Sequence, residues 1–240
     1  MDVPYIASHR AKGAAIYGGP SIRHMLMGDS ALRAESVRLV PIPLAASATH
    51  ERKGQWFYTR DSAFRFMALF ADHAPTLRFL RTNYRFAGGL VAKDLDRLPS
   101  KAGDWKQGEA YSYLIDVLGG AGHATIFRIY YQDAPSSPPL GFPPRELLAD
   151  HAVDLAILCA ATSSNVRATP DSLLRVLSPS SVLVTHWESF FRSQVLPEEI
   201  NRTTDVDAFV LSLNRSLPVT ATWAMPLPQT KFRFPAAVRE

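Results

Sequence analysis

The spacing of hydrophobic positions changes partway along the chain. Up to residue 132, the apolar runs are rich in aromatic and β-branched residues and occur in pairs, which predicts hairpins over residues 55–70 and 110–131. From residue 153 onward, short apolar runs alternate with amphipathic stretches, which predicts strand–helix units. The strands expected there are 153–160, 181–185 and 219–223, and the helices are 170–177 and 203–213. This order predicts an α/β fold with a mixed sheet.

The first fifty residues carry weaker signals. Pro20 suits the first turn of a short helix that runs to about Met27. Residues 37–44 have the composition of a strand but contain Pro41 and Pro43, which favours a sheet edge or the entry to a loop. Because the chain shows neither an internal repeat nor a linker, its 240 residues are expected to form one domain, 1–240.

Composition narrows the class of protein. The chain is 47% hydrophobic and 20% charged, which is typical of a folded protein and not of a disordered one. Cys159 is the single cysteine, so an intramolecular disulfide and a cysteine-rich zinc module are excluded. It lies in an apolar run and is expected to be a small buried hydrophobe. Asp116, inside the apolar segment 113–117, is expected to be a buried, hydrogen-bonded carboxylate with a structural role.

The charge balance is mildly basic. There are 26 Lys and Arg residues against 22 Asp and Glu, giving a net charge of +4 and a pI near 9.3. The basic residues form no patch or stripe, so no nucleic-acid partner is expected, and salt-sensitive binding to DNA or RNA would contradict this. No apolar stretch approaches the ~20 residues of a membrane span, and the N-terminus lacks a signal sequence. The chain as written is expected to be cytoplasmic, without a membrane partner.

Potential metal ligands follow three of the predicted strands, while the common nucleotide-binding and serine-hydrolase motifs are absent. These residues are His73 with its neighbour Asp72, then Asp133, and then His186. Strand ends that lead into tight loops are where functional sites are usually built. Two imidazoles and a carboxylate suit zinc, iron or manganese. The alternative is that each histidine is an ordinary hydrogen-bonded residue, which is the commoner role for a single histidine at a strand end.

Five segments, taken in series, resemble the metallo-β-lactamase-fold (MBL-fold) metallo-hydrolases. They occur in the order found in that family, between about residues 3 and 225. The segments are KGAAIYGGP at 12–20, ADHAP at 71–75, YLIDV at 113–117, FRIYYQDA at 127–134 and LVTHWESFF at 183–191.

The resemblance implies an αββα four-layer sandwich with a metal site at the edge of its sheets. His73 resembles the third metal-binding histidine of the family, Asp133 its bridging aspartate and His186 its final histidine. Asp72 is expected either to orient His73 or to form a turn. The implied function is hydrolysis of a small-molecule substrate by a metal-activated water, with zinc as the expected metal.

The sequence also departs from the family. The signature His-x-His-x-Asp-His, which supplies most of the metal ligands, is not present, and the first residues resemble the segment that follows it. We therefore expect an N-terminally incomplete member of the fold. One hypothesis is that the true start lies upstream, and the other is that the chain is a non-catalytic remnant that binds a partner. In either case the 240-residue chain is expected to be inactive or impaired, and to expose a sheet edge through which it self-associates.

Overall fold

The structure is a computed structural model that describes residues 3–75, 77–79, 82–84, 88–120, 123–189, 193, 195–202 and 204–234. The chain divides into two compact units, and each is described by itself. Unit 1 comprises Met1–Ala46 and Tyr84–Ala110, and unit 2 comprises Ser47–Asn83 and Tyr111–Glu240. This division into compact units does not test whether residues 1–240 form one domain, which therefore stays a prediction.

Unit 1 consists of short helices and a small parallel sheet. Pro20 occupies the first turn of α2, as its fixed φ predicts. The proline-containing strand has three residues and ends at Pro41. It pairs in parallel with an earlier strand, so that Leu39 lies opposite Ile16. A small core around Leu26 and Leu32 holds these pieces together. The elements are α1 (Val3–Tyr5), η1 (Ile6–Arg10), β1 (Ile16–Gly18), α2 (Pro20–Leu26), α3 (Ser30–Ala34), η2 (Ser36–Arg38), β2 (Leu39–Pro41), η3 (Leu44–Ala46) and η4 (Ala102–Asp104).

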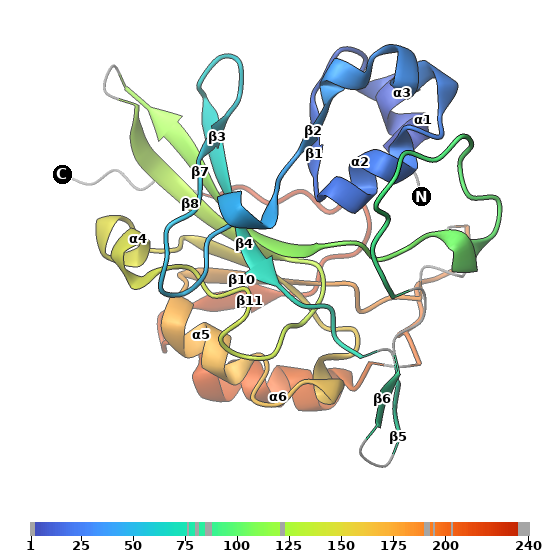
Figure 1. The fold of residues 1–240 in the computed structure, drawn as a ribbon. Helices are drawn as coiled ribbons and strands as arrows, with labels where there is room; N and C mark the ends of the chain where they lie inside the picture. The colour runs from blue at the N-terminus through green and yellow to red at the C-terminus, as the bar shows by residue number, and fades with distance from the viewer. Residues whose placement is uncertain are drawn as a thin grey trace. The chain divides into compact units, whose positions relative to one another are not determined.

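Unit 2 is built on a seven-stranded mixed sheet with the order β11-β10-β9-β8-β7-β4-β3 (Figure 1). A separate pair, β5 and β6, forms a second small sheet. The strands are β3 (Phe57–Tyr58), β4 (Phe64–Ala71), β5 (Leu77–Phe79), β6 (Thr82–Tyr84), β7 (Ala110–Gly119), β8 (Ala124–Gln132), β9 (Leu155–Cys159), β10 (Ser181–Thr185) and β11 (Thr222–Ala224).

The strand directions place several carboxyl ends at one edge of the sheet. β7 and β8 form an antiparallel hairpin, as predicted, and β8, β9, β10 and β11 are parallel. The end of β7 lies beside the start of β4, because Leu118 N donates to Ala63 O (2.8 Å). β4 therefore runs in the same direction as β8. The carboxyl ends of β4, β8, β9 and β10 all meet at this edge.

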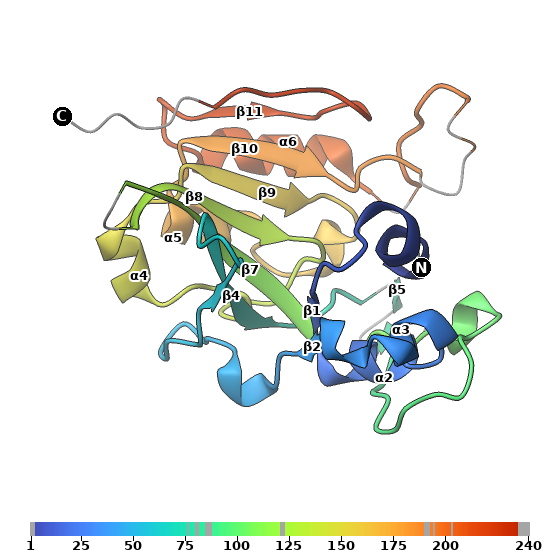
Figure 2. The ribbon, with the colours of Figure 1, turned by 90° about the horizontal axis from the view of Figure 1, so that it is seen from above.

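The helices of unit 2 pack on one face of its large sheet. Leucines of α4 and α5 and two residues of α6, Phe209 and Leu213, share a single buried cluster with Leu114, Tyr130 and Val182 of the sheet. In Figure 2 the sheet lies in front of α5 and α6. These helices are α4 (Arg145–Asp150), α5 (Asp171–Leu177) and α6 (Val206–Ser216), with the short η5 (Ser163–Asn165). The predicted α/β class is confirmed.

The start of the last helix differs from the sequence prediction. The helix expected from residue 203 begins at Val206, because the Asp205 carboxylate accepts the backbone N–H of Ala208 (3.0 Å) and caps the helix. Asp205 therefore precedes the helix instead of lying in its first turn. Within the described part of the chain, no helix has the length and apolar character needed to span a membrane.

Candidate functional site

Each of the predicted site residues directly follows a strand of the large sheet. Asp72 and His73 come after β4, Asp133 after β8 and His186 after β10. Since these strands share one direction, all four residues lie at the same edge of the sheet. The sequence pattern predicted that each residue follows a strand, whereas the common edge follows from the strand directions in the structure.

Asp133 and His186 approach one another at this edge. The Nδ1 atom of His186 lies 4.0 Å from Oδ1 of Asp133, whose side chain is 67% exposed. The hydroxyl of Tyr131 donates to the same carboxylate oxygen (3.2 Å). His186 has a φ of 55°, a left-handed conformation that is uncommon for residues other than glycine. The tight turn after β10 thus aims this imidazole beside the loop after β8.

His73 is held by its own loop. Its Nδ1 atom lies 2.8 Å from the carbonyl of Ala74, so Nδ1 carries a proton and donates it to this oxygen. Asp72 Oδ1 accepts the backbone N–H of the next residue, His73 (2.9 Å), and this contact distinguishes neither of the two roles expected for Asp72. A role for Asp72 in orienting the imidazole stays a prediction.

Neutral side chains tie the strand-end loops together. The Ser136 hydroxyl, from the loop after β8, donates to Asp72 O and accepts from Asp72 N (2.5 and 3.1 Å). The amide of Asn165, from the loop after β9, donates to Pro75 O (2.9 Å). The loop that carries His73 is therefore fixed by protein hydrogen bonds to both neighbouring loops.

The arrangement of these residues does not fit a complete metal site. Among the described residues, no group of three or more His, Cys, Asp or Glu side chains is placed to hold a metal ion. Asp133 and His186 are brought together, but His73 does not complete a three-ligand group with them. Protein sites for zinc use three or four ligands, so two leave the coordination incomplete. The expected zinc, and iron or manganese as its alternatives, stay predictions, and no reaction step is assigned to a metal.

Sequence reasoning overlooked that Cys159 ends β9, between the strands that carry Asp133 and His186. The thiol is buried, with 3% of the residue exposed, and donates weakly to Ala161 O (3.6 Å). Burial raises the pKa of Cys159 well above its ordinary value, and the charges of Asp133 and Glu188 raise it further. Cys159 is therefore an inert thiol, which agrees with its interpretation as a buried hydrophobe. Predicting this position would have required the register between β8, β9 and β10.

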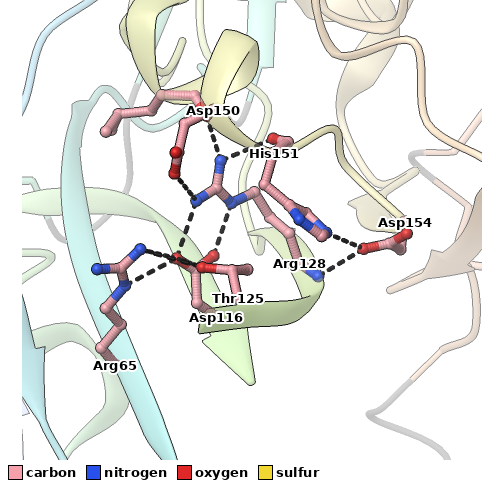
Figure 3. Close-up of polar contacts among 8 residues, drawn as sticks. Arg65, Asp116, Thr125, Arg128, Asp150, His151 and Asp154 are labelled. Carbon is pink, nitrogen blue, oxygen red and sulfur yellow. Dashed lines mark hydrogen bonds and ion pairs between the residues drawn. The ribbon is translucent and has the colours of Figure 1, made fainter. Parts of the chain in front are cut away.

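Asp116 is buried in a charged network on the helix-covered face (Figure 3). Arg128 donates to both carboxylate oxygens, from Nε to Oδ1 (2.6 Å) and from Nη2 to Oδ2 (2.9 Å). Arg65 Nε donates to Oδ2 (2.8 Å), and the Thr125 hydroxyl adds a further bond (3.1 Å). The expected buried, hydrogen-bonded carboxylate is present. The sequence did not indicate that Arg65 and Arg128 are its partners.

Burial of Asp116 and its hydrogen bonds act on its pKa in opposite directions. Burial alone would raise the pKa of the carboxyl group, but the hydrogen bonds and positive charges of Arg128 and Arg65 outweigh this and hold it below the ordinary value of 3.8. Arg128 is itself fully buried and also donates to the carbonyls of Leu147 and His151. Because each charge is saturated by partners, we assign this network to stability and not to catalysis.

Comparison with known proteins gives little further information. The chain matches no protein-family model and no curated protein sequence. Among solved structures, it is similar to a protein from Thermotoga maritima named as a Zn-dependent hydrolase of the metallo-β-lactamase superfamily. The similarity has a TM-score of 0.33 and 8% sequence identity, and it covers 78% of this chain and 74% of that protein.

Proposed function

We propose that this chain is related to the metal-dependent hydrolases of the metallo-β-lactamase fold, and that the 240-residue chain has no measurable hydrolytic activity on its own. The observation that supports the relationship is the pairing of Asp133 and His186 (4.0 Å) at the edge where strand ends meet. These two residues occupy the positions that the family resemblance assigns to metal ligands. The lack of a three-ligand group among the described residues supports the second part of the proposal.

What this edge offers chemically is a carboxylate next to an imidazole, both reachable from solvent. The two groups lie 4.0 Å apart, beyond hydrogen-bond distance, and the Tyr131 hydroxyl donates to one oxygen of the carboxylate. A hydrolase would also need a group that activates water and a group that stabilises the negative charge of the transition state. The described residues at this edge supply neither in a defined geometry.

Metal content and hydrolysis by the purified chain test the proposal together. Zinc per chain would be measured by mass spectrometry, and turnover would be followed with ester, phosphodiester and lactam substrates, with and without added zinc and EDTA. We expect far less than one zinc per chain and no EDTA-sensitive turnover. Robust EDTA-sensitive turnover would refute the inactivity.

Variants then test the relationship. D133A and H186A should each reduce the weak zinc affinity seen in a titration, while H50A, at an exposed histidine in unit 2, should leave it unchanged. If H50A reduced zinc affinity as much as H186A, the pair at the sheet edge would not be the site. The same result would remove the support for the family relationship.

A further inference from the structure

A cavity opens in unit 2 at the amino end of β8, whereas Asp133 follows the carboxyl end of that strand. Its volume is about 420 Å³, which is within the range of cavities that hold small molecules. The walls come from β4, from the start of β8 with the turn before it, and from the end of α4. The described residues that line it are Arg65, His123, Ala124, Thr125, Asp150 and His151. We call this site the polar cavity.

Arg65 is held in a fixed position in the wall of the polar cavity. Its guanidinium lies over the ring of Trp56, with 4.2 Å between Cζ and the ring centre. Its Nε donates to Asp116 Oδ2 (2.8 Å) and its Nη2 to the Thr125 hydroxyl (3.1 Å), as Figure 3 shows. Because these contacts already order the side chain, a ligand that binds it pays little further conformational entropy.

The guanidinium of Arg65 also keeps N–H groups for a further acceptor. It carries five N–H donors. Among the described residues its acceptors are Asp116, Thr125 and Tyr58, which are fewer than its donors. The side chain is 20% exposed, so a ligand in the polar cavity can reach it. A planar guanidinium in such a position is suited to bind a carboxylate.

A β-bulge turns Thr125 toward the polar cavity. The pairing of β7 with β8 shifts at Leu118, which lies opposite Thr125, so Ile126 is an extra residue in β8. Gly119 leaves room for it, since a Cβ there would lie 2.9 Å from the Ile126 side chain. The shift places Thr125 on the same face as Asp116, to which its hydroxyl donates (3.1 Å). Bulges commonly re-aim a side chain beside a functional site.

Asp150 supplies the opposite charge on another wall of the polar cavity. Its side chain is 66% exposed, and its Oδ2 lies 3.8 Å from Nη2 of Arg128. That nitrogen donates to Asp116 Oδ2 (2.9 Å), the oxygen that also accepts from Arg65. Asp150 and Arg65 are therefore separated by a short row of contacting atoms, and among the described ion pairs none joins them directly. Walls of opposite charge are complementary to a ligand that carries both charges.

We propose that the polar cavity binds a small zwitterion, a free α-amino acid, with its carboxylate on Arg65 and its ammonium group on Asp150. A ligand with only one of these charges leaves the other wall without a partner and binds more weakly. The imidazole of His151 is held by Asp154 (3.0 Å) and offers a fixed wall. His123 is exposed in the turn before β8, and its imidazole has no hydrogen bond to another described residue, so it can contact the side chain of the amino acid.

Isothermal titration calorimetry of the full chain with the common L-amino acids, one at a time, tests the ligand class. At least one should bind saturably. Its N-acetyl form, which lacks the ammonium group, and its amide, which lacks the carboxylate, should each bind at least about fivefold more weakly. Absence of binding by every amino acid, or equal affinity for the N-acetyl form or the amide, would overturn the proposal.

A matched pair of variants on α4 tests the position of the ligand. D150N removes the carboxylate from the polar cavity and should weaken binding about fivefold. E146Q removes a carboxylate that is 69% exposed on the same helix and contacts Lys53, so it should leave affinity unchanged. Both substitutions are at exposed positions and should leave the fold intact. Equal affinities in the two variants would contradict the assignment of the ammonium group to Asp150.

Hydrogen exchange of the unmodified chain locates the ligand independently. With the amino acid bound, peptides that contain Thr125 or Asp150 should exchange more slowly, whereas peptides that contain His186 should not change. Slowing confined to the peptides with His186 would place the ligand at the other end of the strands and would overturn the proposal. None of these measurements depends on metal or hydrolysis, so the polar cavity and the hydrolase relationship succeed or fail separately.

Discussion

Asp116 and Asp133 belong to neighbouring parts of one sheet, yet their surroundings are opposite. Asp116 lies within β7, is fully buried, and receives hydrogen bonds from two arginines. Asp133 follows β8, is mostly exposed, and has Tyr131 and His186 beside it. The same side chain is thus a fixed structural charge in one place and an exposed carboxylate beside an imidazole in the other. Burial and the number of donors, not residue type, separate the two roles.

The difference also has an energetic side. A carboxylate removed from water costs several kcal/mol unless strong donors replace its hydration. Asp116 receives these donors in bidentate geometry from Arg128, which is held in turn by backbone carbonyls. Asp133 keeps its contact with water and needs no such network. We therefore expect substitutions at the two positions to act on different properties of the protein.

The largest effect is expected from R128M. Removing this guanidinium leaves the Asp116 carboxylate buried with Arg65 as its remaining cation, which should lower the free energy of unfolding by about 3–5 kcal/mol. Urea unfolding monitored by tryptophan fluorescence measures it. The matched control, R175M, alters an exposed arginine on α5 and should change the free energy by less than about 0.5 kcal/mol. Equal losses in both variants would show that the network is not what stabilises the sheet.

Acid should reveal the same network through its pH dependence. The pKa of Asp116 lies below 3.8 in the folded state and near 3.8 in the unfolded state. The ionised carboxylate therefore contributes its full stabilisation above about pH 3.8, and this stabilisation is lost as the pH falls from there through the folded-state pKa. The melting temperature of the unmodified chain should therefore fall steeply below about pH 4. D133N should keep this slope, whereas D116N should flatten it. A flatter slope in D133N would place the acid-sensitive group at the sheet edge instead.

A smaller effect is expected from the backbone at His186. Its left-handed conformation, with φ of 55°, should make H186G about 1 kcal/mol more stable than H186A, because glycine adopts this region without strain. At His50, which lacks a positive φ, the order should reverse, and H50A should be the more stable variant of that pair. Thermal unfolding of the four variants measures both differences. If alanine were preferred at both positions, the turn after β10 would carry no strain.

The smallest effect is expected from D133N alone. This change removes a charge that is mostly exposed, so the free energy of unfolding should change by less than about 0.5 kcal/mol. Denaturant unfolding under the conditions used for R128M provides the comparison. A loss above 1 kcal/mol would mean that Asp133 is a structural residue like Asp116, and the contrast between the two would fail.

The local pattern of apolar and polar residues was sufficient to predict much of the secondary structure of unit 2. The strand predicted at 181–185 is observed as Ser181–Thr185, and the helix predicted at 170–177 as Asp171–Leu177. Both are short, strongly apolar elements whose composition and flanking residues determine them locally. The short pair β1 and β2 was only partly foreseen. Its strands are three residues each and depend on pairing between Ile16 and Leu39, distant in the sequence.

The candidate site was predictable to the level of the strand ends and no further. Pattern alone predicts that Asp133 and His186 follow strands, and parallel pairing places them at one edge. Whether two side chains meet at 4 Å depends on turn geometry such as the positive φ of His186, which composition does not encode. The pairing of Asp116 with Arg128 was easier to predict from the sequence, since both are charged residues inside apolar strands of one predicted hairpin. The contact between Asp116 and Arg65 was harder to predict, because the two residues are 51 positions apart.

The route of the chain between the two units has a consequence for folding. The neighbouring strands β4 and β7 are separated by about forty residues, most of which belong to β6 and to the second segment of unit 1. The entropy cost of closing such a loop grows only with the logarithm of its length, by about 0.6 kcal/mol for each doubling. Lengthening this stretch would therefore lower the stability of the sheet very little. During synthesis, however, β4 can pair with β7 only after the whole inserted segment has left the ribosome.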